Sequence, residues 1–190
     1  MAAFRLKIKH EFPRPIGYGY TEIEDGMKEN LLILGAGQFG LMVKEIAEHT
    51  GLFAKIDFLD DNNPIAIGGL ADYEMFLGDY QCAVVAIGNP HIRFSWLEKL
   101  EAAGFRIATL VSPAAYVSPT AVIGRGTIVE PMAVLQANST VLRGCIVSSG
   151  AVIRHDAYLE ELCHVDCNAV VMSQSVVLTK TKVNASEVYR

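Results

Sequence analysis

The sequence predicts two unlike halves, an α/β domain followed by an all-β solenoid of short parallel strands. Three observations support this division. An aliphatic residue occupies every sixth position from Val111 to Val183. A small residue stands two positions before each of these aliphatic residues. Upstream, apolar strand-like runs alternate with helical segments around a glycine-rich turn, which is typical of a parallel sheet with crossover helices.

A six-residue period is the signature of a parallel β-helix. Three hexads make one coil of triangular section, in which each aliphatic side chain points inward and stacks on its counterpart one coil away. An α-helix would need apolar spacings of three and four, and an ordinary strand would end after about five or six residues. The aliphatic positions are Val111, Val117, Ile123, Val129, Leu135, Val141, Val147, Ile153, Leu159, Val165, Val171, Val177 and Val183.

We divide the chain into four parts. Residues 1–26 form an N-terminal extension, which starts with an alternating apolar and basic pattern that fits either an edge strand or a plain extension. Residues 27–107 form the α/β domain, residues 108–183 hold about four coils, and residues 184–190 form a short polar tail. Within the α/β domain we expect, in order, a strand at 31–34, a helix at 38–50, a strand at 54–59, a strand at 82–87, a helix at 92–103 and a strand at 105–110.

Composition and charge exclude several classes of function. The formal net charge is −5 and no loop carries a run of Lys or Arg, which argues against nucleic acid as a partner. No apolar run approaches the roughly 18 residues that span a bilayer. The first ten residues lack the continuous apolar core of a signal peptide. We therefore expect a cytoplasmic protein with no membrane partner.

The four cysteines are predicted to be reduced thiols. Cys145 and Cys163 lie one coil apart and should stack inside the solenoid as small apolar residues. Cys163, His164 and Cys167 are close in sequence and could suggest a metal site. Their spacing matches no zinc pattern and a second ligand pair is missing, so we expect no metal.

A glycine-rich turn, Gly35-x-Gly37-x-x-Gly40, lies between the first strand and the first helix, with Asp60 and Asp61 about twenty positions further on. Such a turn lets the backbone approach phosphates at a helix N-terminus, and the acidic residues could accept hydrogen bonds from a ribose. A Rossmann-like turn without a ligand is the alternative. The sheet is small and the second half is no dehydrogenase substrate domain, so a nucleotide-sugar fits better than a redox dinucleotide.

His155 and Asp156 interrupt a coil near a corner, where both should be exposed. An imidazole there could act as a general base at neutral pH, and the carboxylate could orient it and stabilise its protonated form. The alternative is an ordinary surface pair. His164 lies half a coil away, on the opposite side of the prism, so the two histidines share a site only if they come from different subunits. We therefore predict an active site between adjacent subunits of a trimer.

Together these segments resemble the hexapeptide-repeat sugar acetyltransferases, which include the nucleotide-sugar N-acetyltransferase of bacillosamine synthesis and the sialic acid O-acetyltransferases. The resemblance covers about residues 29–172. It implies a Rossmann-like domain that binds a UDP-sugar, fused to a left-handed β-helix that binds acetyl-CoA, in a homotrimer. The motifs that carry it are the glycine turn with Asp60-Asp61, Ala86-Ile87-Gly88-Asn89, Ala108-Thr109-Leu110-Val111-Ser112-Pro113 and Gly150-Ala151-Val152-Ile153-Arg154-His155-Asp156.

The resemblance also implies roles for individual residues. His155 is the base, Asp156 raises its basicity, and His164 contacts acetyl-CoA near the thioester. Ser148 and Gly150 are expected beside the same co-substrate. The residues expected to line the nucleotide-sugar pocket are Gly35, Gly37, Gln38, Phe39, Asp60, Asp61 and Gly88.

Two departures from the family leave questions open. The family usually has Gly-His where this chain has Gln38-Phe39, which leaves the acceptor open. Its solenoid usually continues for about two further coils that carry much of the CoA site, whereas the array here stops at Val183. Either CoA is held differently, with Lys180 and Lys182 near its phosphates, or it binds weakly.

The sequence thus predicts an acetyl-CoA-dependent acetyltransferase that modifies an amino or hydroxyl group of a nucleotide-sugar. A non-catalytic trimer that only binds or scaffolds a nucleotide-sugar is the alternative. A β-helical carbonic anhydrase would need three histidines on a metal, and the solenoid has two.

Overall fold

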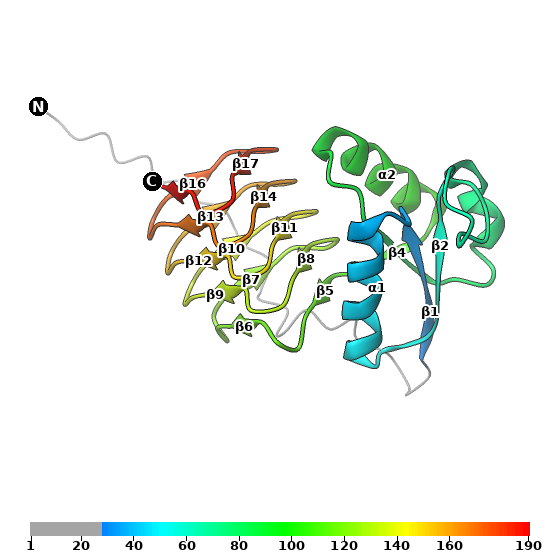
Figure 1. Ribbon diagram of the computed structural model, residues 1–190, viewed down its shortest axis with the longest axis horizontal. Helices are drawn as coiled ribbons and strands as arrows, with labels where there is room; N and C mark the ends of the chain where they lie inside the picture. Colours follow the sequence, from blue (N-terminus) through cyan, green and yellow to red (C-terminus); the bar gives the residue numbers. More distant parts are fainter. Residues whose placement is uncertain (1–27) are drawn as a thin grey trace, which may run out of the picture.

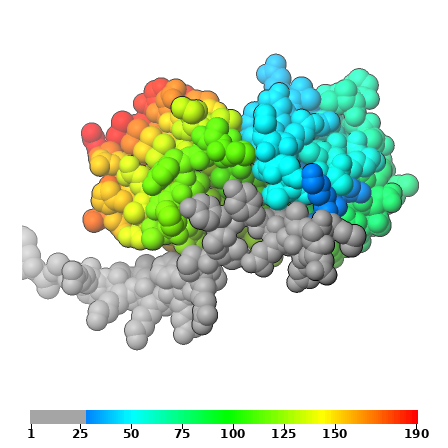
Figure 2. All heavy atoms as spheres, turned by 90° about the horizontal axis from the view of Figure 1, so that it is seen from below, coloured from blue at the N-terminus to red at the C-terminus, as the bar shows by residue number. Residues whose placement is uncertain are grey.

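The computed structural model describes residues 28–190, so the predicted extension at residues 1–26 lies outside the described part. Two bodies lie side by side, an α/β domain and a prism of stacked coils (Figure 1). The space-filling view shows the first coils, in green, in contact with the blue and cyan atoms of the α/β domain (Figure 2).

The α/β domain has one four-stranded parallel sheet in the order β2-β1-β3-β4. Both predicted helices are confirmed, and the structure adds a 3₁₀ helix that is not predicted from the sequence. The elements are β1 (Glu29–Leu34), α1 (Gln38–Thr50), β2 (Phe53–Leu59), η2 (Leu70–Phe76), β3 (Cys82–Val85), α2 (Pro90–Ala103) and β4 (Arg106–Ile107).

The central strand β1 is covered on both faces. Leu31 and Ile33 belong to the apolar cluster that includes α1, and Leu32 and Leu34 belong to the cluster that includes α2. All four side chains are fully buried. A strand covered on both sides has no polar face, which is why this segment is a continuous apolar run rather than an alternating one.

Helix α2 begins two residues earlier than predicted because of its cap. The side chain of Asn89 accepts hydrogen bonds from the backbone N–H groups of His91 and Ile92, and Pro90 occupies the first turn. Gly104 ends the helix in the left-handed conformation with φ 100°, as predicted from its position. Within residues 28–190, neither this helix nor any other is long and apolar enough to cross a membrane.

The second half is the left-handed parallel β-helix that the hexads predict. Its three sheets contain five, five and four strands, and each strand pairs with strands one coil away, as in the register of Val152 with Val134 and Val170. The strands are β5 (Leu110–Val111), β6 (Tyr116–Val117), β7 (Val122–Ile123), β8 (Ile128–Val129), β9 (Val134–Leu135), β10 (Thr140–Val141), β11 (Ile146–Val147), β12 (Val152–Ile153), β13 (Tyr158–Leu159), β14 (His164–Val165), β15 (Val170–Val171), β16 (Val176–Val177), β17 (Lys182–Val183) and β18 (Val188–Tyr189).

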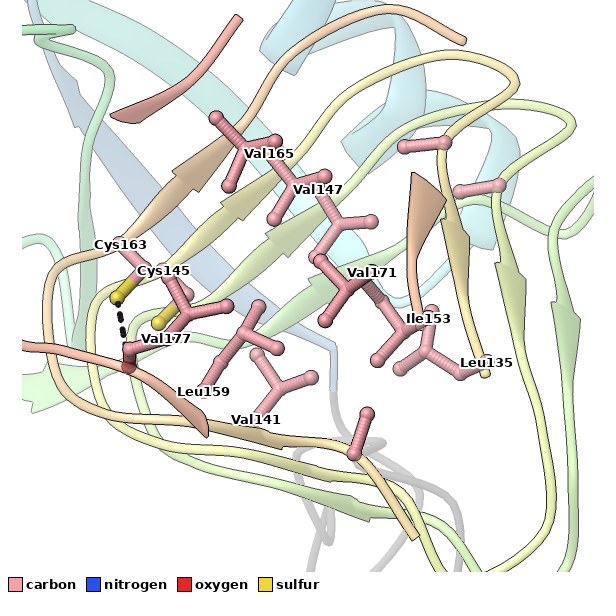
Figure 3. Close-up of a cluster of buried hydrophobic side chains, with 14 of the residues drawn as sticks. Leu135, Val141, Cys145, Val147, Ile153, Leu159, Cys163, Val165, Val171 and Val177 are labelled. Atoms are coloured by element: carbon pink, nitrogen blue, oxygen red, sulfur yellow. Dashed lines mark hydrogen bonds between the residues drawn. The ribbon is translucent and has the colours of Figure 1, made fainter. Parts of the chain in front are cut away.

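The interior of the prism is filled by the residues that the period predicts. Stacked aliphatic side chains such as Val141, Leu159 and Val177 form one buried column (Figure 3). Cys145 and Cys163 stack in the same interior and are fully buried, as expected for thiols that act as small core residues.

The corners of the prism share one backbone feature. Every sixth residue from Gly126 onward has a positive φ, which turns the chain from one sheet to the next. Gly, Asn and Asp tolerate this conformation best, and they hold several of the positions. The residues are Gly126, Met132, Asn138, Gly144, Gly150, Asp156, Leu162, Asn168, Gln174, Lys180 and Ser186.

The predicted polar tail at residues 184–190 is instead part of the solenoid. Strand β18 pairs with β15, and Tyr189 packs against the interior column six positions after Val183. The aliphatic pattern ends at Val183 because an aromatic residue takes the next inward position. The hexad geometry therefore continues one step beyond the aliphatic series.

One face of the prism is covered by the α/β domain. Leu110, Ile128 and Ile146 point outward from the sheet β5-β8-β11-β14-β17 and are nevertheless buried. Leu110 and Ile128 lie in the same apolar cluster as residues of α1, and Leu162 lies in the cluster of α2. The predicted strand at residues 105–110 is accordingly split between the α/β sheet, as β4, and the first coil, as β5.

Candidate active site

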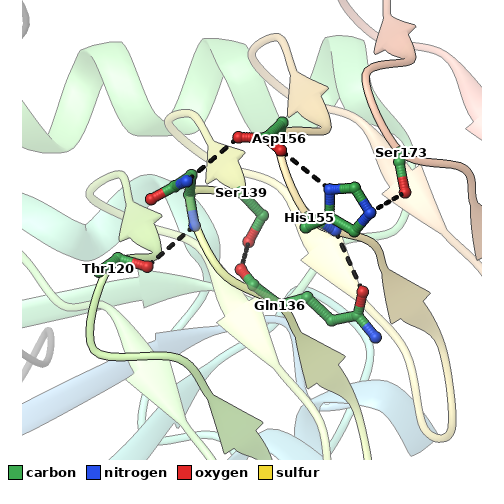
Figure 4. Close-up of polar contacts among 7 residues, drawn as sticks. Thr120, Gln136, Ser139, His155, Asp156 and Ser173 are labelled. Atoms are coloured by element: carbon green, nitrogen blue, oxygen red, sulfur yellow. Dashed lines mark hydrogen bonds and ion pairs between the residues drawn. The ribbon is translucent and has the colours of Figure 1, made fainter.

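The predicted catalytic pair lies at an exposed corner of the β-helix, in the turn between β12 and β13. His155 Nδ1 lies 2.9 Å from Asp156 Oδ2, and His155 Nε2 lies 2.9 Å from Ser173 Oγ (Figure 4). The side chains of His155 and Asp156 are 47% and 45% exposed. One nitrogen of the imidazole is therefore paired with a carboxylate and the other with a serine hydroxyl.

Residues one coil before the pair support it. Asn138 Nδ2 donates a hydrogen bond to Asp156 Oδ1 at 3.2 Å, and Gln136 Oε1 accepts one from the backbone N–H of His155 at 3.1 Å. The hydrogen bond from His155, followed by that from Asn138, lowers the pKa of Asp156 below its ordinary value. Asp156 is thus held as a carboxylate that orients the imidazole of His155.

Sequence reasoning missed Ser173, Asn138 and Gln136 as partners of His155 and Asp156. The sequence contained a signal for two of them, because equivalent positions on successive coils are separated by three hexads in the sequence. Ser173 is one coil after His155, and Asn138 is one coil before Asp156. Reading the polar residues down each corner would have found both.

His164 occupies a different environment, on strand β14. Its Nε2 lies 3.1 Å from the Oγ of Ser148, which is buried on the preceding coil. Burial lowers the pKa of His164 below its ordinary value. The imidazole is therefore neutral at neutral pH, and the predicted neighbours His164 and Ser148 are in direct contact.

The other residues predicted around acetyl-CoA already have structural partners. A Cβ at Gly150 would lie 2.2 Å from the side-chain oxygen of Asn168, and its φ is 72°, so this position requires glycine. Lys182 Nζ lies 2.9 Å from Asp166 Oδ2, and Lys180 Nζ lies 5.1 Å from the ring centroid of Phe94. Neither lysine is free of contacts within the chain.

The two histidines lie on opposite sides of the prism. His164 belongs to the sheet β5-β8-β11-β14-β17, whereas His155 lies at the corner between the other two sheets. In a triangular prism that corner is opposite the face that carries His164. The structure thus brings His155 to Asp156 and His164 to Ser148, and within one chain it keeps the two pairs apart.

The glycine turn ends strand β1 and starts helix α1, at the edge where β1 and β3 both end. A Cβ at Gly40 would lie 2.0 Å from the carbonyl oxygen of Gly35, and Gly35 itself has φ 102°. Gly37 differs, because a Cβ there would meet nothing within 4 Å. Two glycines are therefore needed for packing, while the third borders open space at a helix N-terminus, where anions bind readily.

The acidic pair after β2 is used to hold this loop. Asp60 Oδ2 accepts a hydrogen bond from the N–H of Ala36 at 2.8 Å, and its Oδ1 accepts from Asn62 and Asn63. These bonds, first that from Ala36, lower the pKa of Asp60. Asp61 Oδ1 accepts from the N–H of Leu70 at the start of η2. Both carboxylates thus shape the predicted pocket from within the protein.

The remaining predicted pocket residues surround the same edge of the sheet. Gln38 is the first residue of α1 and is exposed, whereas Phe39 packs in part against the α/β core. Gly88 is exposed in the turn between β3 and α2. Gln38 and Gly88 offer a polar side chain and a bare backbone to a ligand, and Phe39 anchors the turn.

Among residues 28–190 there is no group of three His, Cys, Asp or Glu side chains that could hold a metal ion. Cys163 points into the solenoid interior, where its thiol donates to the carbonyl of Leu178 at 3.1 Å. Its sequence neighbour His164 contacts Ser148 instead.

Known proteins share both halves of this arrangement. Residues 30–100 match the family described as the PglD N-terminal domain. The acetyltransferase domain of PglB from Neisseria gonorrhoeae FA1090 is 30% identical over 85% of this chain and 88% of that one, with a TM-score of 0.73. A structure of that domain in complex with acetyl coenzyme A is 29% identical over the same shares, with a TM-score of 0.66.

A more distant structure has the same fold. PerB from Caulobacter crescentus, in complex with CoA and GDP-perosamine, has a TM-score of 0.64 and 21% identity. The alignment covers 85% of this chain and 91% of that chain. The two-part architecture is therefore common to all three structures.

Proposed function

The chain belongs to the hexapeptide-repeat sugar acetyltransferases, and on that premise we propose that it transfers an acetyl group from acetyl-CoA to a nucleotide-sugar. The acceptor atom is the nitrogen of an amino group or the oxygen of a hydroxyl group on the sugar. The observation that carries the proposal is the contact between His155 and Asp156 at an exposed corner, with Nε2 beside the hydroxyl of Ser173.

In the proposed reaction the sugar nucleophile replaces the hydroxyl of Ser173 beside His155 Nε2. It attacks the thioester carbonyl carbon while His155 takes the proton from the attacking atom. The tetrahedral intermediate then collapses, the C–S bond breaks, and the CoA sulfur leaves and recovers a proton. Asp156 stabilises the imidazolium between these steps. Both substrates meet directly, so no covalent enzyme intermediate is required.

We further propose that the active unit is a homotrimer with sites between subunits. His155 and His164 are on opposite sides of one chain, so a site that uses both needs two copies. A stripe of outward apolar residues runs along the sheet next to the His155 corner, and a neighbouring copy could cover it. The stripe consists of Tyr116, Val134, Val152, Val170 and Val188. Sedimentation equilibrium tests this, and a monomeric mass would exclude shared sites.

The nucleotide-sugar is proposed to bind at the glycine turn, with a UDP carrier as first expectation. The open space at Gly37 and the exposed Gln38 at the start of α1 favour a diphosphate there. Because PerB binds a GDP-sugar, the test uses both carriers. The purified chain is mixed with acetyl-CoA and with UDP- or GDP-linked sugars, one set with an amino group and one set with hydroxyl groups only, and release of the free CoA thiol is followed. Release only with an amino-sugar supports N-acetylation, and release only with a hydroxyl acceptor supports O-acetylation.

A scaffold that binds a nucleotide-sugar without turnover is the second candidate. Lys182 Nζ already contacts Asp166 Oδ2 and Lys180 Nζ lies over the ring of Phe94, so neither lysine expected near the CoA phosphates is free of contacts. Titration calorimetry with acetyl-CoA separates the two candidates. Saturable binding supports the transferase, and heat with a UDP-sugar but none with acetyl-CoA supports the scaffold.

We propose a cytoplasmic reaction, since acetyl-CoA is an intracellular donor.

A further inference from the structure

Arg93, on helix α2, is fully buried and has no role in the proposed chemistry. Four of its N–H groups donate hydrogen bonds, and every acceptor is a backbone carbonyl. Nη1 donates to Ile87 at 2.9 Å and to Gly88 at 2.8 Å. Nε donates to Gly144 at 2.7 Å, and Nη2 donates to Leu162 at 2.8 Å. One guanidinium thus joins three segments that are far apart in the sequence.

The segments that Arg93 joins belong to the two candidate ligand sites. Ile87 and Gly88 form the loop after β3, where the nucleotide-sugar is proposed to bind. Gly144 and Leu162 are corner residues on successive coils, and each directly precedes the segment that leads into β11 or β14. Strand β14 begins with His164. A single side chain is therefore hydrogen-bonded both to the loop and to the corner that precedes this strand.

A purely structural role explains this arrangement poorly. Apolar contacts of Leu110, Ile128 and Leu162 already hold the two bodies together. Burial disfavours the charged form and lowers the pKa of Arg93 to about 10. This value is still well above 7, and the guanidinium is therefore charged at neutral pH. A buried cation is costly, and a well-packed apolar side chain often serves stability as well or better. What an apolar side chain cannot do is fix four carbonyl groups in a set geometry.

We propose that Arg93 is a positioning residue that fixes the nucleotide-sugar loop at Ile87–Gly88 against the coils that carry His164. The inference rests on the proposed function. Acetyl transfer needs the acceptor atom within reach of both the thioester and the histidine base, and a displacement of about 1 Å can cost a large part of the rate. If the site is shared between copies, the acceptor reaches His155 of a neighbouring copy only when its own α/β domain is held firmly on its own β-helix.

Arg143 offers a matched control. It also joins α2 to a coil corner, with Nη1 at 2.6 Å from Glu98 and Nη2 at 2.8 Å from Glu101. Its partners are side chains rather than the loop after β3. Loss of Arg143 should weaken the contact between the two bodies without releasing Ile87 or Gly88.

The test compares Arg93→Met, Arg93→Lys and Arg143→Met in the full chain. Amide hydrogen exchange of residues 86–89 is measured first, without any ligand. We expect exchange at Ala86, whose N–H donates to the carbonyl of Leu34, to accelerate by about tenfold or more in Arg93→Met, by less in Arg93→Lys, and not in Arg143→Met. Exchange in the interior coils at residues 146–159, which hold no partner of Arg93, should stay within about twofold of wild type. Equal exchange of the loop in all four proteins would overturn the inference, whatever the activity of the wild type.

The second measurement is calorimetric binding of UDP-N-acetylglucosamine, GDP-mannose and acetyl-CoA. Arg93→Met should weaken whichever nucleotide-sugar binds wild type by about tenfold or more and change acetyl-CoA affinity less than about threefold. An equal loss of nucleotide-sugar affinity in Arg143→Met would show that Arg93 has only a structural role. An equal loss of affinity for the nucleotide-sugar and for acetyl-CoA in Arg93→Met would show the same. Binding of both ligands by wild type without acetyl transfer would refute the proposed function and leave the Arg93 comparison intact. Failure of wild type to bind either nucleotide-sugar would overturn both.

Discussion

The α/β domain and the β-helix build their candidate sites in opposite ways. In the α/β domain the backbone forms the site, and polar side chains are used to shape that backbone. Both carboxylate oxygens of Asp60 accept hydrogen bonds from backbone N–H groups. The donors are Ala36 in the glycine turn, and Asn62 and Asn63 in the loop after β2. In the β-helix, the coil backbones satisfy one another, as in the bonds from Arg154 N–H to Val171 and from Asp156 N–H to Ala137. The imidazole of His155 at that corner therefore contacts side chains, those of Asp156 and Ser173, and no backbone group depends on it.

This difference predicts where a substitution acts. A change at the glycine turn should cost folding as well as binding, because the ligand site and the packing use the same atoms. A change at the His155 corner should cost chemistry alone, because the stacked aliphatic interior does not depend on it. The four predictions below test this separation.

The largest effect is expected for His155→Ala. The side chain is about half exposed and contributes no core packing. Loss of the general base should lower kcat by roughly 10²–10⁴-fold while the melting temperature changes little. Steady-state kinetics and thermal melting measure the two quantities. His49→Ala, at an exposed position near the end of α1, is the control. Unchanged turnover would remove His155 from the mechanism.

Gly40→Ala should show the opposite behaviour. Its Cβ would lie 2.0 Å from the carbonyl oxygen of Gly35, so strand β1 and helix α1 must separate. We expect a loss of about 3 kcal/mol in the free energy of unfolding of the α/β domain, measured by urea denaturation. Gly37→Ala is the matched control, with a loss below about 1 kcal/mol, because nothing lies near its Cβ. Equal losses in the two variants would contradict the packing argument.

Asp60→Asn should have a smaller, pH-dependent effect. The pKa of Asp60 is lowered in the folded state, so its carboxylate stabilises the fold above the unfolded value of about 3.9. This contribution is lost as pH falls through the folded pKa. Removing the charged acceptor should cost about 1 kcal/mol at pH 7, and the difference from wild type should shrink below about pH 4. Urea denaturation at pH 7, 5 and 3 measures it, and a gap that widens in acid would show that the sign is wrong.

The smallest effect is expected for His164→Gln. Burial lowers the pKa of His164 in the folded state, so on acidification the unfolded chain takes up this proton first. Wild type should therefore lose stability as pH falls below about 6.5, and the variant should lose less. The difference in melting temperature between pH 7.5 and 5.5 should be about 2 °C smaller in the variant. Identical pH profiles would indicate that His164 titrates as an ordinary surface histidine.

Much of this molecule was predictable because its patterns are local. The hexads predicted the β-helix and its inward residues, including Cys145 and Cys163. The glycine turn predicted the end of β1 and the start of α1, and Gly104 predicted the end of α2. The neighbours His155 and Asp156 are adjacent in sequence, so their contact needed only an exposed corner. The last inward position is occupied by Tyr189, which is aromatic and not aliphatic. The aliphatic series therefore ended before it, and residues 184–190 were interpreted as a tail.

Arg93 shows what local patterns cannot reveal. A single arginine in a helix normally indicates a solvent-exposed face, and the residues around it carry no sign of the four carbonyls that surround it. Those carbonyls come from Ile87, Gly88, Gly144 and Leu162, which only the docking of two bodies brings together.

By itself the sequence determined that the second half coils and how it fills its interior, because both follow from a repeat within a few residues. Only the tertiary structure decided which face of the prism the α/β domain covers. Outward apolar residues occur on all three faces, such as Ile128 and Ile146 on one, Val134 and Val152 on another, and Val122 and Val176 on the third. The choice between such faces depends on how well the whole surface of α1 and α2 fits each one. A six-residue repeat gives no information about that fit.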